Sequence, residues 1–336
     1  MVRYARSIAA LQRRASVRAP IRARLWHHRA MRRACLAFSL VLAACGGGSS
    51  DDDAPVDAPE ATVDAPDGWQ TLLQGNWSLE AGEEGYYCVY ATVPRDIYIK
   101  AFRPIGPNGT HHTVLTRYTG NEPDGTVRCG VGTNGQSMVY GSGVGSPDFR
   151  FPEGVGMHFT AGTRLLLNLH LYNTTDEVLT GTSGTLFEET QAADIEHVGE
   201  IVLAGPTATL TVPTGTSTQS GTCNVSNITN QPIQVFALSQ HMHKLGRNLR
   251  TVVRRSGSAD IVLQDTAYDF ENQTFSLVPT PFVELRPGDV ITTSCTFENN
   301  TGATVTFGES SDDEMCFSDL FYYPAQGANF VCSNFF

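Results

Sequence analysis

The chain has 336 residues, which is long enough for two hydrophobic cores, and 17% of its residues are charged. The first 44 residues hold ten of the 23 basic side chains and no acidic one, which leaves 13 basic against 34 acidic residues in the rest of the chain. This acidic remainder disfavours nucleic acid and anionic membrane surfaces as partners of the folded part.

The N-terminus has the features of an export signal. Residues 35–44 form an apolar run that is too short to span a bilayer and follows two arginines. The run ends in Leu-Ala-Ala-Cys at residues 42–45, a sequence similar to a bacterial lipobox, in which Cys45 would carry lipid. The alternative is an ordinary signal peptide with a cysteine there by chance. We exclude residues 1–44 from the fold, and residues 1–30 are either a mis-assigned start or an unusually long basic region.

Residues 45–68 predict a flexible, acidic tether. They contain a Gly-Ser run and three Asp-Ala-Pro units, with no apolar surface to bury. Order is expected to begin near Trp69. The protein is therefore expected in the bacterial cell envelope, on the periplasmic or outer-membrane face, and bound to the membrane only through its lipid.

The remaining chain predicts an all-β fold, because short runs rich in Val, Ile, Thr and Phe alternate with Gly, Pro, Asn and Asp. Strands are expected at residues 86–93, 97–103, 112–118, 164–172, 199–203, 207–212, 235–243, 250–254, 290–297 and 317–323. An acidic stretch at 188–196 separates two groups of strands, which predicts domains at 69–195 and 196–336. Segments 162–173 and 288–299 both run from Gly to Asn through an apolar run, a weak indication of two similar β-sandwiches.

Six cysteines follow Cys45, and an even number in an exported protein predicts three disulfides. Fifteen pairings are possible, and the spacing does not choose among them. A cysteine metal site is the alternative, although the sequence has no Cys-x-x-Cys pair to support it. The six are Cys88, Cys129, Cys223, Cys295, Cys316 and Cys332.

The strand expected at 235–243 ends in a His-x-His motif. Residues two apart share a face of a strand, so His241 and His243 point the same way as Ser239. Phe236 and Leu238 are expected on the opposite face, toward a core, together with Met242. Two imidazoles at a strand end before a glycine turn fit a metal site. Two surface histidines are the alternative.

Further histidines and one methionine extend the set of candidate ligands. His111 and His112 are neighbours, so both can reach one ion only where the strand is irregular. His170 lies on an apolar strand, where a lone histidine is usually structural. His158 and His197 are interpreted as structural or exposed.

Met315 stands between acidic residues and Cys316, an unusual place for a core residue. Its thioether is a soft ligand that favours Cu(I). Two imidazoles and a thioether fit copper that changes oxidation state better than structural zinc, which prefers four His or Cys ligands.

In this order the motifs resemble the copper type II, ascorbate-dependent monooxygenases, which include peptidylglycine α-hydroxylating and dopamine β-hydroxylating enzymes. The shared features are the His-His pair, the strand histidine, the His-x-His motif before Gly246, the Gly288-Asp289 turn, and Asp-Glu-Met-Cys at 313–316. The resemblance covers about residues 80–336. It implies two tandem jelly-roll β-sandwich domains with one copper ion each.

The resemblance also implies roles for the ligands. An electron-transferring copper would be held by His111, His112 and His170. The copper that reacts with O₂ would be held by His241, His243 and Met315, across an open, wet cleft. Ascorbate or another one-electron reductant would be a co-substrate, and a small organic substrate would be hydroxylated. The disulfides implied are Cys88–Cys129, Cys223–Cys332 and Cys295–Cys316.

The sequence departs from the family at three positions. Leu171 follows the third histidine where Tyr is common, which is a mild change. Ser239 stands where the amidating relatives carry Arg, and Asp319 stands where they carry Tyr; both positions concern substrate recognition. Asp319 shares a face with Met315 and is expected to favour an amine-bearing aromatic substrate over a carboxylate. A copper-binding or storage lipoprotein without turnover and a β-sandwich binding module are the alternative functions.

Overall fold

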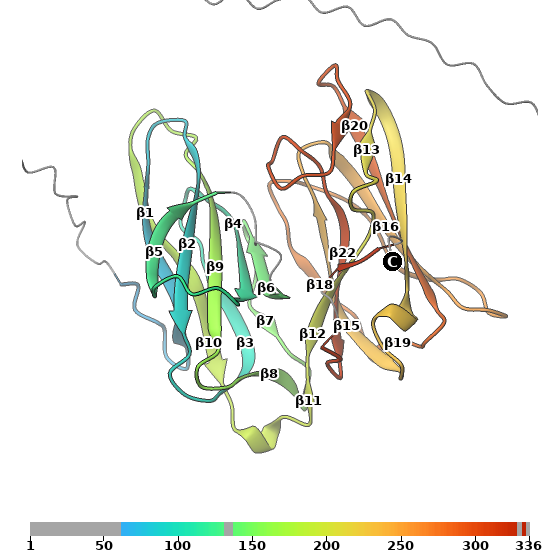
Figure 1. Ribbon diagram of the computed structural model, residues 1–336, viewed down its shortest axis with the longest axis horizontal. Helices are drawn as coiled ribbons and strands as arrows, with labels where there is room; N and C mark the ends of the chain where they lie inside the picture. The colour runs from blue at the N-terminus through green and yellow to red at the C-terminus, as the bar shows by residue number, and fades with distance from the viewer. Residues whose placement is uncertain (1–61, 131–136, 328–330, 334–336) are drawn as a thin grey trace, which may run out of the picture. The chain divides into compact units, whose positions relative to one another are not determined.

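The computed structural model describes residues 62–130, 137–327 and 331–333. The expected signal peptide, most of the tether and the lipid site at Cys45 lie outside the described residues. The described chain is all-β, as predicted, with two short 3-10 helices at Ala192–Asp194 and Val225–Asn227 (Figure 1). A helix long and apolar enough to cross a membrane is not found within these ranges.

The first part of the chain forms two sheets, which are antiparallel except for the β8–β11 pair. One has the order β1 (Gln70–Leu79), β10 (Leu179–Glu189), β3 (Ile97–Ile105), β8 (Val155–Phe159) and β11 (His197–Val198), with β7 (Phe149–Arg150) beside β3. The other has the order β5 (Gly125–Cys129), β2 (Glu84–Thr92), β9 (Arg164–Tyr172), β4 (Thr110–Arg117) and β6 (Ser137–Gly143). Buried side chains of both sheets, such as Phe102 and Leu167, belong to one core cluster, so the sheets pack as a sandwich.

The second part repeats this plan. One sheet has the order β18 (Phe275–Leu277), β15 (Ile233–Met242), β22 (Cys316–Tyr323), β12 (Glu200–Ala204) and β23 (Val331–Cys332), with β19 (Val283–Leu285) beside β15. The other has the order β14 (Gly215–Asn224), β20 (Val290–Asn299), β16 (Gly246–Arg254) and β17 (Ile261–Ala267), and β13 (Thr211–Val212) pairs with β21 (Val305–Thr306). Leu238 and Leu320 of the first sheet share a core cluster with Val253 and Ile291 of the second.

Most expected strand limits are shifted by one to four residues, and two differences are larger or concern the domain boundary. The strand expected at 207–212 is reduced to β13, because the Leu210 N–H donates to the Thr207 carbonyl at 2.7 Å and closes a turn. Strand β11 lies beyond the expected boundary at 195 and 196, yet it pairs in parallel with β8 of the first sandwich. The domain limits themselves stay a prediction.

The two repeated Gly-to-Asn segments correspond to β9 and β20, and a turn of the same kind follows each strand. Asn173 follows β9, and its Oδ1 accepts from the backbone N–H and the hydroxyl of Thr175 at 2.9 and 2.7 Å. Asn299 ends β20, and its Oδ1 accepts from the same two groups of Thr301 at 3.0 and 2.8 Å. The weak sequence repeat therefore corresponds to a repeated local structure in the two sandwiches.

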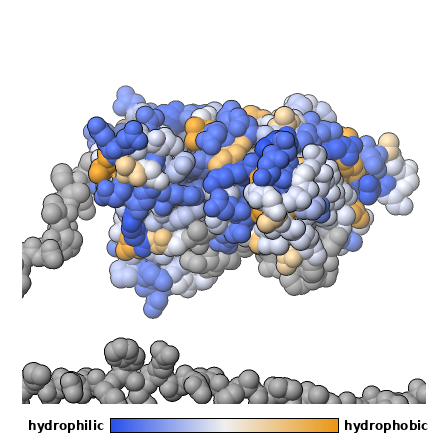
Figure 2. All heavy atoms as spheres, turned by 90° about the horizontal axis from the view of Figure 1, so that it is seen from above, coloured by the Kyte–Doolittle hydropathy of each residue, from blue (hydrophilic) through white to orange (hydrophobic). Residues whose placement is uncertain are grey.

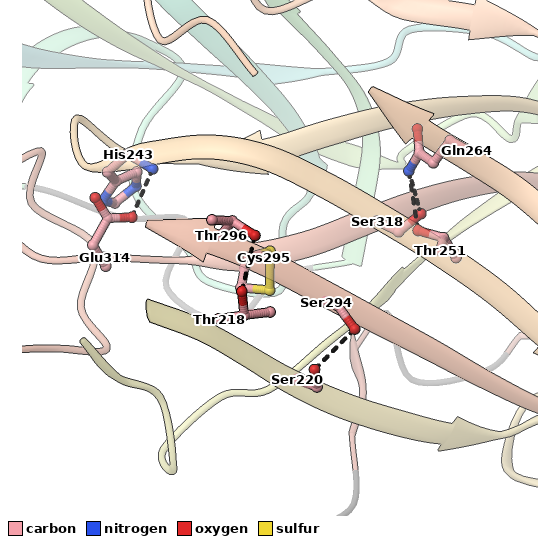
Figure 3. Close-up of a disulfide and its surroundings, with 11 residues drawn as sticks. Thr218, Ser220, His243, Thr251, Gln264, Ser294, Cys295, Thr296, Glu314 and Ser318 are labelled. Atoms are coloured by element: carbon pink, nitrogen blue, oxygen red, sulfur yellow. Dashed lines mark hydrogen bonds between the residues drawn. A yellow bond between two sulfur atoms is a disulfide. The ribbon is translucent and has the colours of Figure 1, made fainter. Parts of the chain in front are cut away.

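Three disulfides are present, with the pairing that the resemblance implied. They join β2 to β5, β14 to β23, and β20 to β22, through Cys88–Cys129, Cys223–Cys332 and Cys295–Cys316. The last one links two facing sheets and fixes the start of β22, directly after Met315 (Figure 3).

One apolar cluster contains side chains from both sandwiches. The Phe149 ring of β7 lies 4.9 Å from the Phe275 ring and 4.6 Å from the Phe321 ring, centroid to centroid. Phe236 also belongs to this cluster, although the period of two placed it on the opposite face from Ala237. Phe236, Leu238 and Met242 are all buried, as predicted, but Phe236 lies at a β-bulge between Val235 and Ala237 and belongs to a different core cluster from Leu238. The outer surface seen in Figure 2 is mostly hydrophilic, with scattered apolar residues.

Candidate functional site

Three histidines of the first sandwich come together on neighbouring strands. Strand β4 pairs Thr110 with Leu171 and His112 with His170, which leaves His111 as the extra residue of a β-bulge. A bulge re-aims side chains, and this explains how two adjacent histidines reach one place. The bulge is the irregularity that the sequence required.

The ring nitrogens of these histidines lie within metal-binding range of one another. Candidate ligand atoms of His111, His112 and His170 are all within 4.8 Å. The Nδ1 atoms of His111 and His112 are 3.0 Å apart, and those of His112 and His170 are 3.3 Å apart. Burial lowers the pKa of each ring, that of His170 to about 4, so the three rings are neutral at pH 7 and can offer lone pairs.

Two residues that the sequence analysis missed hold His170 from behind. Its Nε2 lies 2.6 Å from Oε1 of Glu84, so this nitrogen donates and Nδ1 is left facing the other histidines. The Tyr86 ring stacks on the imidazole at 4.5 Å. Glu84 and Tyr86 are two residues apart on β2, but only the pairing of β2 with β9 brings them to His170.

His241 and His243 lie at the end of β15, with ring centroids 5.3 Å apart. His241 Nδ1 is 3.3 Å from Oε1 of Gln273, and His243 Nδ1 is 3.1 Å from the carbonyl of Asp313. These oxygens can only accept, so each ring presents Nε2 as its free lone pair. Burial lowers the pKa of both rings, that of His241 to about 3, which keeps them neutral.

Glu314 orders the turn after this strand. Its side chain is fully buried and accepts from the backbone N–H of His243 at 3.0 Å and of Leu245 at 2.7 Å (Figure 3). Strands β15 and β22 pair as far as Met242 and Cys316, and Met315 directly precedes Cys316. The Met315 side chain is partly buried against the core cluster that contains Phe317, and its role as a ligand stays a prediction.

The two histidine groups lie close together. The His112 and His241 ring centroids are 6.3 Å apart, and Phe270 packs on His111 at 4.4 Å. A cavity of about 60 Å³ lies beside them, lined by His112 and His241. The loop between β17 and β18 borders it through Gln273, whose carbonyl accepts from the Ser146 hydroxyl of the first sandwich at 3.1 Å. The expected open, wet cleft stays a prediction.

Two of the three positions that depart from the family, those that concern substrate recognition, are cross-strand neighbours. Ser239 on β15 pairs with Asp319 on β22, and the Ser239 hydroxyl donates to Asp319 Oδ2 at 2.7 Å. Asp319 is 5% exposed and lines the same cavity, while its Oδ1 has no hydrogen-bond partner among the described residues. Burial raises its pKa to about 7, and the bond from Ser239 opposes this shift. Asp319 is thus a poorly solvated carboxyl group with one unused oxygen.

The other two described histidines lie apart from this site. His158 stacks on Tyr98 at 4.3 Å, and His197 is exposed and stacks on Tyr323 at 5.3 Å. Both have the structural or exposed roles expected from the sequence.

Comparison with known proteins agrees with this geometry. A family model described as the C-terminal domain of copper type II ascorbate-dependent monooxygenases matches residues 197–335. The human putative DBH-like monooxygenase protein 2 is 26% identical over 298 residues, which cover 80% of this chain and 58% of that protein. Bos taurus dopamine beta-hydroxylase is 30% identical over 196 residues, 54% of this chain and 32% of that protein. Xenopus laevis peptidyl-glycine alpha-amidating monooxygenase A is 28% identical over 255 residues, 71% and 26% respectively.

The chain spans 58% or less of the length of these relatives. Similarity reaches both sandwiches, since the longest of these matches covers 80% of the chain. Residues 197–335 therefore belong to the C-terminal domain family of the copper type II, ascorbate-dependent monooxygenases, and the chain as a whole is similar to such enzymes.

Proposed function

We propose that this protein is a copper-dependent monooxygenase that hydroxylates a C–H bond of a small organic substrate. The reaction consumes O₂, two protons and two electrons from ascorbate or another one-electron reductant, and it yields the alcohol and water. The observation that carries the proposal is the convergence of five buried or partly buried histidines in two groups, with one histidine of each group lining the same cavity. Their donor set fits two copper ions, one in each group.

His111, His112 and His170 would hold the first ion, and His241, His243 and Met315 the second. Copper, when bound, would supply the one-electron steps and the activation of O₂. Three imidazoles accept both oxidation states, whereas the thioether of Met315 favours Cu(I). Burial keeps all five rings neutral, and Glu84, Gln273 and Asp313 orient His170, His241 and His243 respectively.

The substrate is proposed to be an amine-bearing aromatic molecule. Asp319 lines the cavity together with Phe275 and Phe321, and its buried Oδ1 has no hydrogen-bond partner among the described residues. An ammonium group would satisfy that oxygen with a charge-assisted hydrogen bond. A substrate carboxylate would meet Asp319 without the arginine that the amidating relatives carry, because Ser239 stands there.

Metal analysis and oxygen uptake test this function. The purified chain should bind two copper ions and take up O₂ with ascorbate and a phenethylamine-type substrate. Met315→Leu keeps the side-chain volume but removes the sulfur, so it should weaken Cu(I) binding at one site and abolish hydroxylation. His197→Ala, at an exposed histidine outside the site, is the matched control. One copper, or zinc in its place, contradicts the proposal, and two coppers without turnover favour a copper-storage protein.

We also propose the finer organisation that the sequence implied. The two sandwiches, at residues 69–195 and 196–336, would both be jelly rolls, and Cys45 would carry a lipid that holds the protein at the bacterial cell envelope. The lipobox and the flexible tether support the anchor. Cys45→Ala should then release the protein from the membrane fraction with its copper binding intact, and a variant that stays membrane-bound contradicts the anchor.

A further inference from the structure

Glu84 makes contacts that join the two histidine groups. It is the first residue of β2, and its Oε1 accepts from His170 Nε2 at 2.6 Å. The same oxygen accepts from the Ser311 hydroxyl at 2.9 Å, across 227 residues of chain. One carboxylate oxygen thus contacts a histidine of the first sandwich and a loop of the second.

The Ser311 loop organises the second histidine group. It connects β21 to β22, and Ser311 itself is 5% exposed. Within four residues of Ser311, the Asp313 carbonyl accepts from His243 Nδ1, the Glu314 carboxylate accepts from the His243 N–H, and Met315 follows. A shift of this loop would therefore move the acceptor of His243 together with the thioether.

We infer that Glu84 is a positioning residue that sets the orientation of His170 at the three-histidine group and, through Ser311, the position of the Met315 loop at the other group. The inference rests on the proposed function, since it concerns how the chain's own residues would hold copper. A carboxylate behind a ligand imidazole fixes the ring and increases its basicity, and losing such a partner typically lowers metal affinity about 10–100-fold. The hydrogen bond from Ser311 to Glu84 adds an energetic coupling between the two histidine groups, which neither set of ligands provides by itself.

Four variants separate the contact of Glu84 with His170 from its contact with Ser311. Glu84→Ala removes both contacts, Glu84→Gln keeps an acceptor oxygen without the charge, and Ser311→Ala removes only the loop contact. Glu83→Gln is the matched control, because the neighbouring Glu83 pairs with Arg128 on the surface. Copper affinity is measured by chelator competition in the full chain, with His243→Ala isolating the three-histidine site and His111→Ala isolating the other.

Glu84→Ala should lower Cu(II) affinity at the three-histidine site about 10–100-fold, with a smaller loss for Glu84→Gln. Where the loss falls on Cu(II) alone, the reduction potential rises by about 59 mV for each tenfold change. Both Glu84→Ala and Ser311→Ala should lower Cu(I) affinity at the methionine site about fivefold or more. In the metal-free chain, nitrogen NMR should find His170 protonated at Nε2, and a mixture of tautomers in Glu84→Ala.

The inference is overturned if Glu84→Ala leaves both affinities within about threefold of the wild type, or if it lowers only the melting temperature. Should Glu84→Ala fail to fold, Glu84→Gln and Ser311→Ala decide by the same criteria. A wild-type chain that binds no copper at the three histidines refutes the proposed function instead. If the wild-type chain binds two copper ions and the Glu84 variants bind them with unchanged affinity, only this inference is refuted.

Discussion

The protonation state of Asp319 bears directly on the substrate proposed above. Burial raises its pKa to about 7, so protonation and ionisation compete in the physiological range. An ammonium group pairs with the ionised form only. The other titratable groups that line the cavity, His112 and His241, have lowered pKa values and stay neutral.

We therefore expect the KM for a phenethylamine substrate to fall as the pH rises from about 6 to 8, by up to about tenfold. In Asp319→Asn this dependence should disappear, with a higher KM throughout. Steady-state oxygen uptake measures both, and an analogue with a hydroxyl in place of the amine serves as the control. A pH dependence that persists in Asp319→Asn, or efficient turnover of a C-terminal glycine peptide, contradicts the assignment.

At this scale the sequence identified the candidate ligands but not the groups that orient them. The period of two along a strand predicts that His241 and His243 point the same way. The approach of His111 and His112 depends on a β-bulge, which no local sequence pattern predicts. Glu84 is 86 residues from His170, and Gln273 is 32 residues from His241. Such contacts depend on strand pairing and loop closure, so an acidic or amide residue in a polar stretch gives no sign of them.

At the scale of secondary-structure elements, Glu314 links the loop between β21 and β22 to the turn that follows β15. Its buried carboxylate takes up two backbone N–H groups at the end of β15. Glu314→Ala leaves both donors without their acceptor and should lower the free energy of unfolding by about 3 kcal/mol. Glu314→Gln keeps an acceptor oxygen and should lose less.

Urea unfolding of the metal-free chain measures these changes. Glu298→Ala is the control, because Glu298 pairs with Arg247 at the exposed surface and should change stability by less than about 0.5 kcal/mol. If Glu314→Ala unfolds like this control, the carboxylate does not hold the turn.

The sequence predicted apolar strands better than polar ones. Strand β9 has the predicted limits, because five buried leucines run along it. Strands β10 and β14 were not predicted, since they are rich in Gly, Ser and Thr and show little apolar alternation. They form through pairing with β1, β3 and β20, which supplies the backbone hydrogen bonds that their side chains do not predict.

For the whole molecule, the aromatic cluster around Phe149 makes the two sandwiches depend on each other. This side chain is 1% exposed and contacts phenylalanines of the second sandwich. Phe149→Ala should lower the free energy of unfolding by about 3–5 kcal/mol. Because the cavity lies at the contact between the sandwiches, calorimetry should show one unfolding transition in the wild type and two separated transitions in the variant.

Val178→Ala is a suitable control, since Val178 is 56% exposed and should leave the single transition in place. Two transitions in the wild type would mean that the sandwiches unfold independently, and the cluster would then have no role in joining them.

The loop that borders the cavity has a kinetic consequence. A space of about 60 Å³ holds only a few water molecules, far less than the several hundred Å³ of a typical small-molecule pocket. An aromatic amine of the proposed kind is larger than this space, so Gln273 would have to leave Ser146, or Phe270 leave His111, for it to bind. Each turnover of the proposed reaction would then include a displacement of this loop through solvent, and where that displacement limits the rate, kcat should fall in proportion to the viscosity of an added sugar solution.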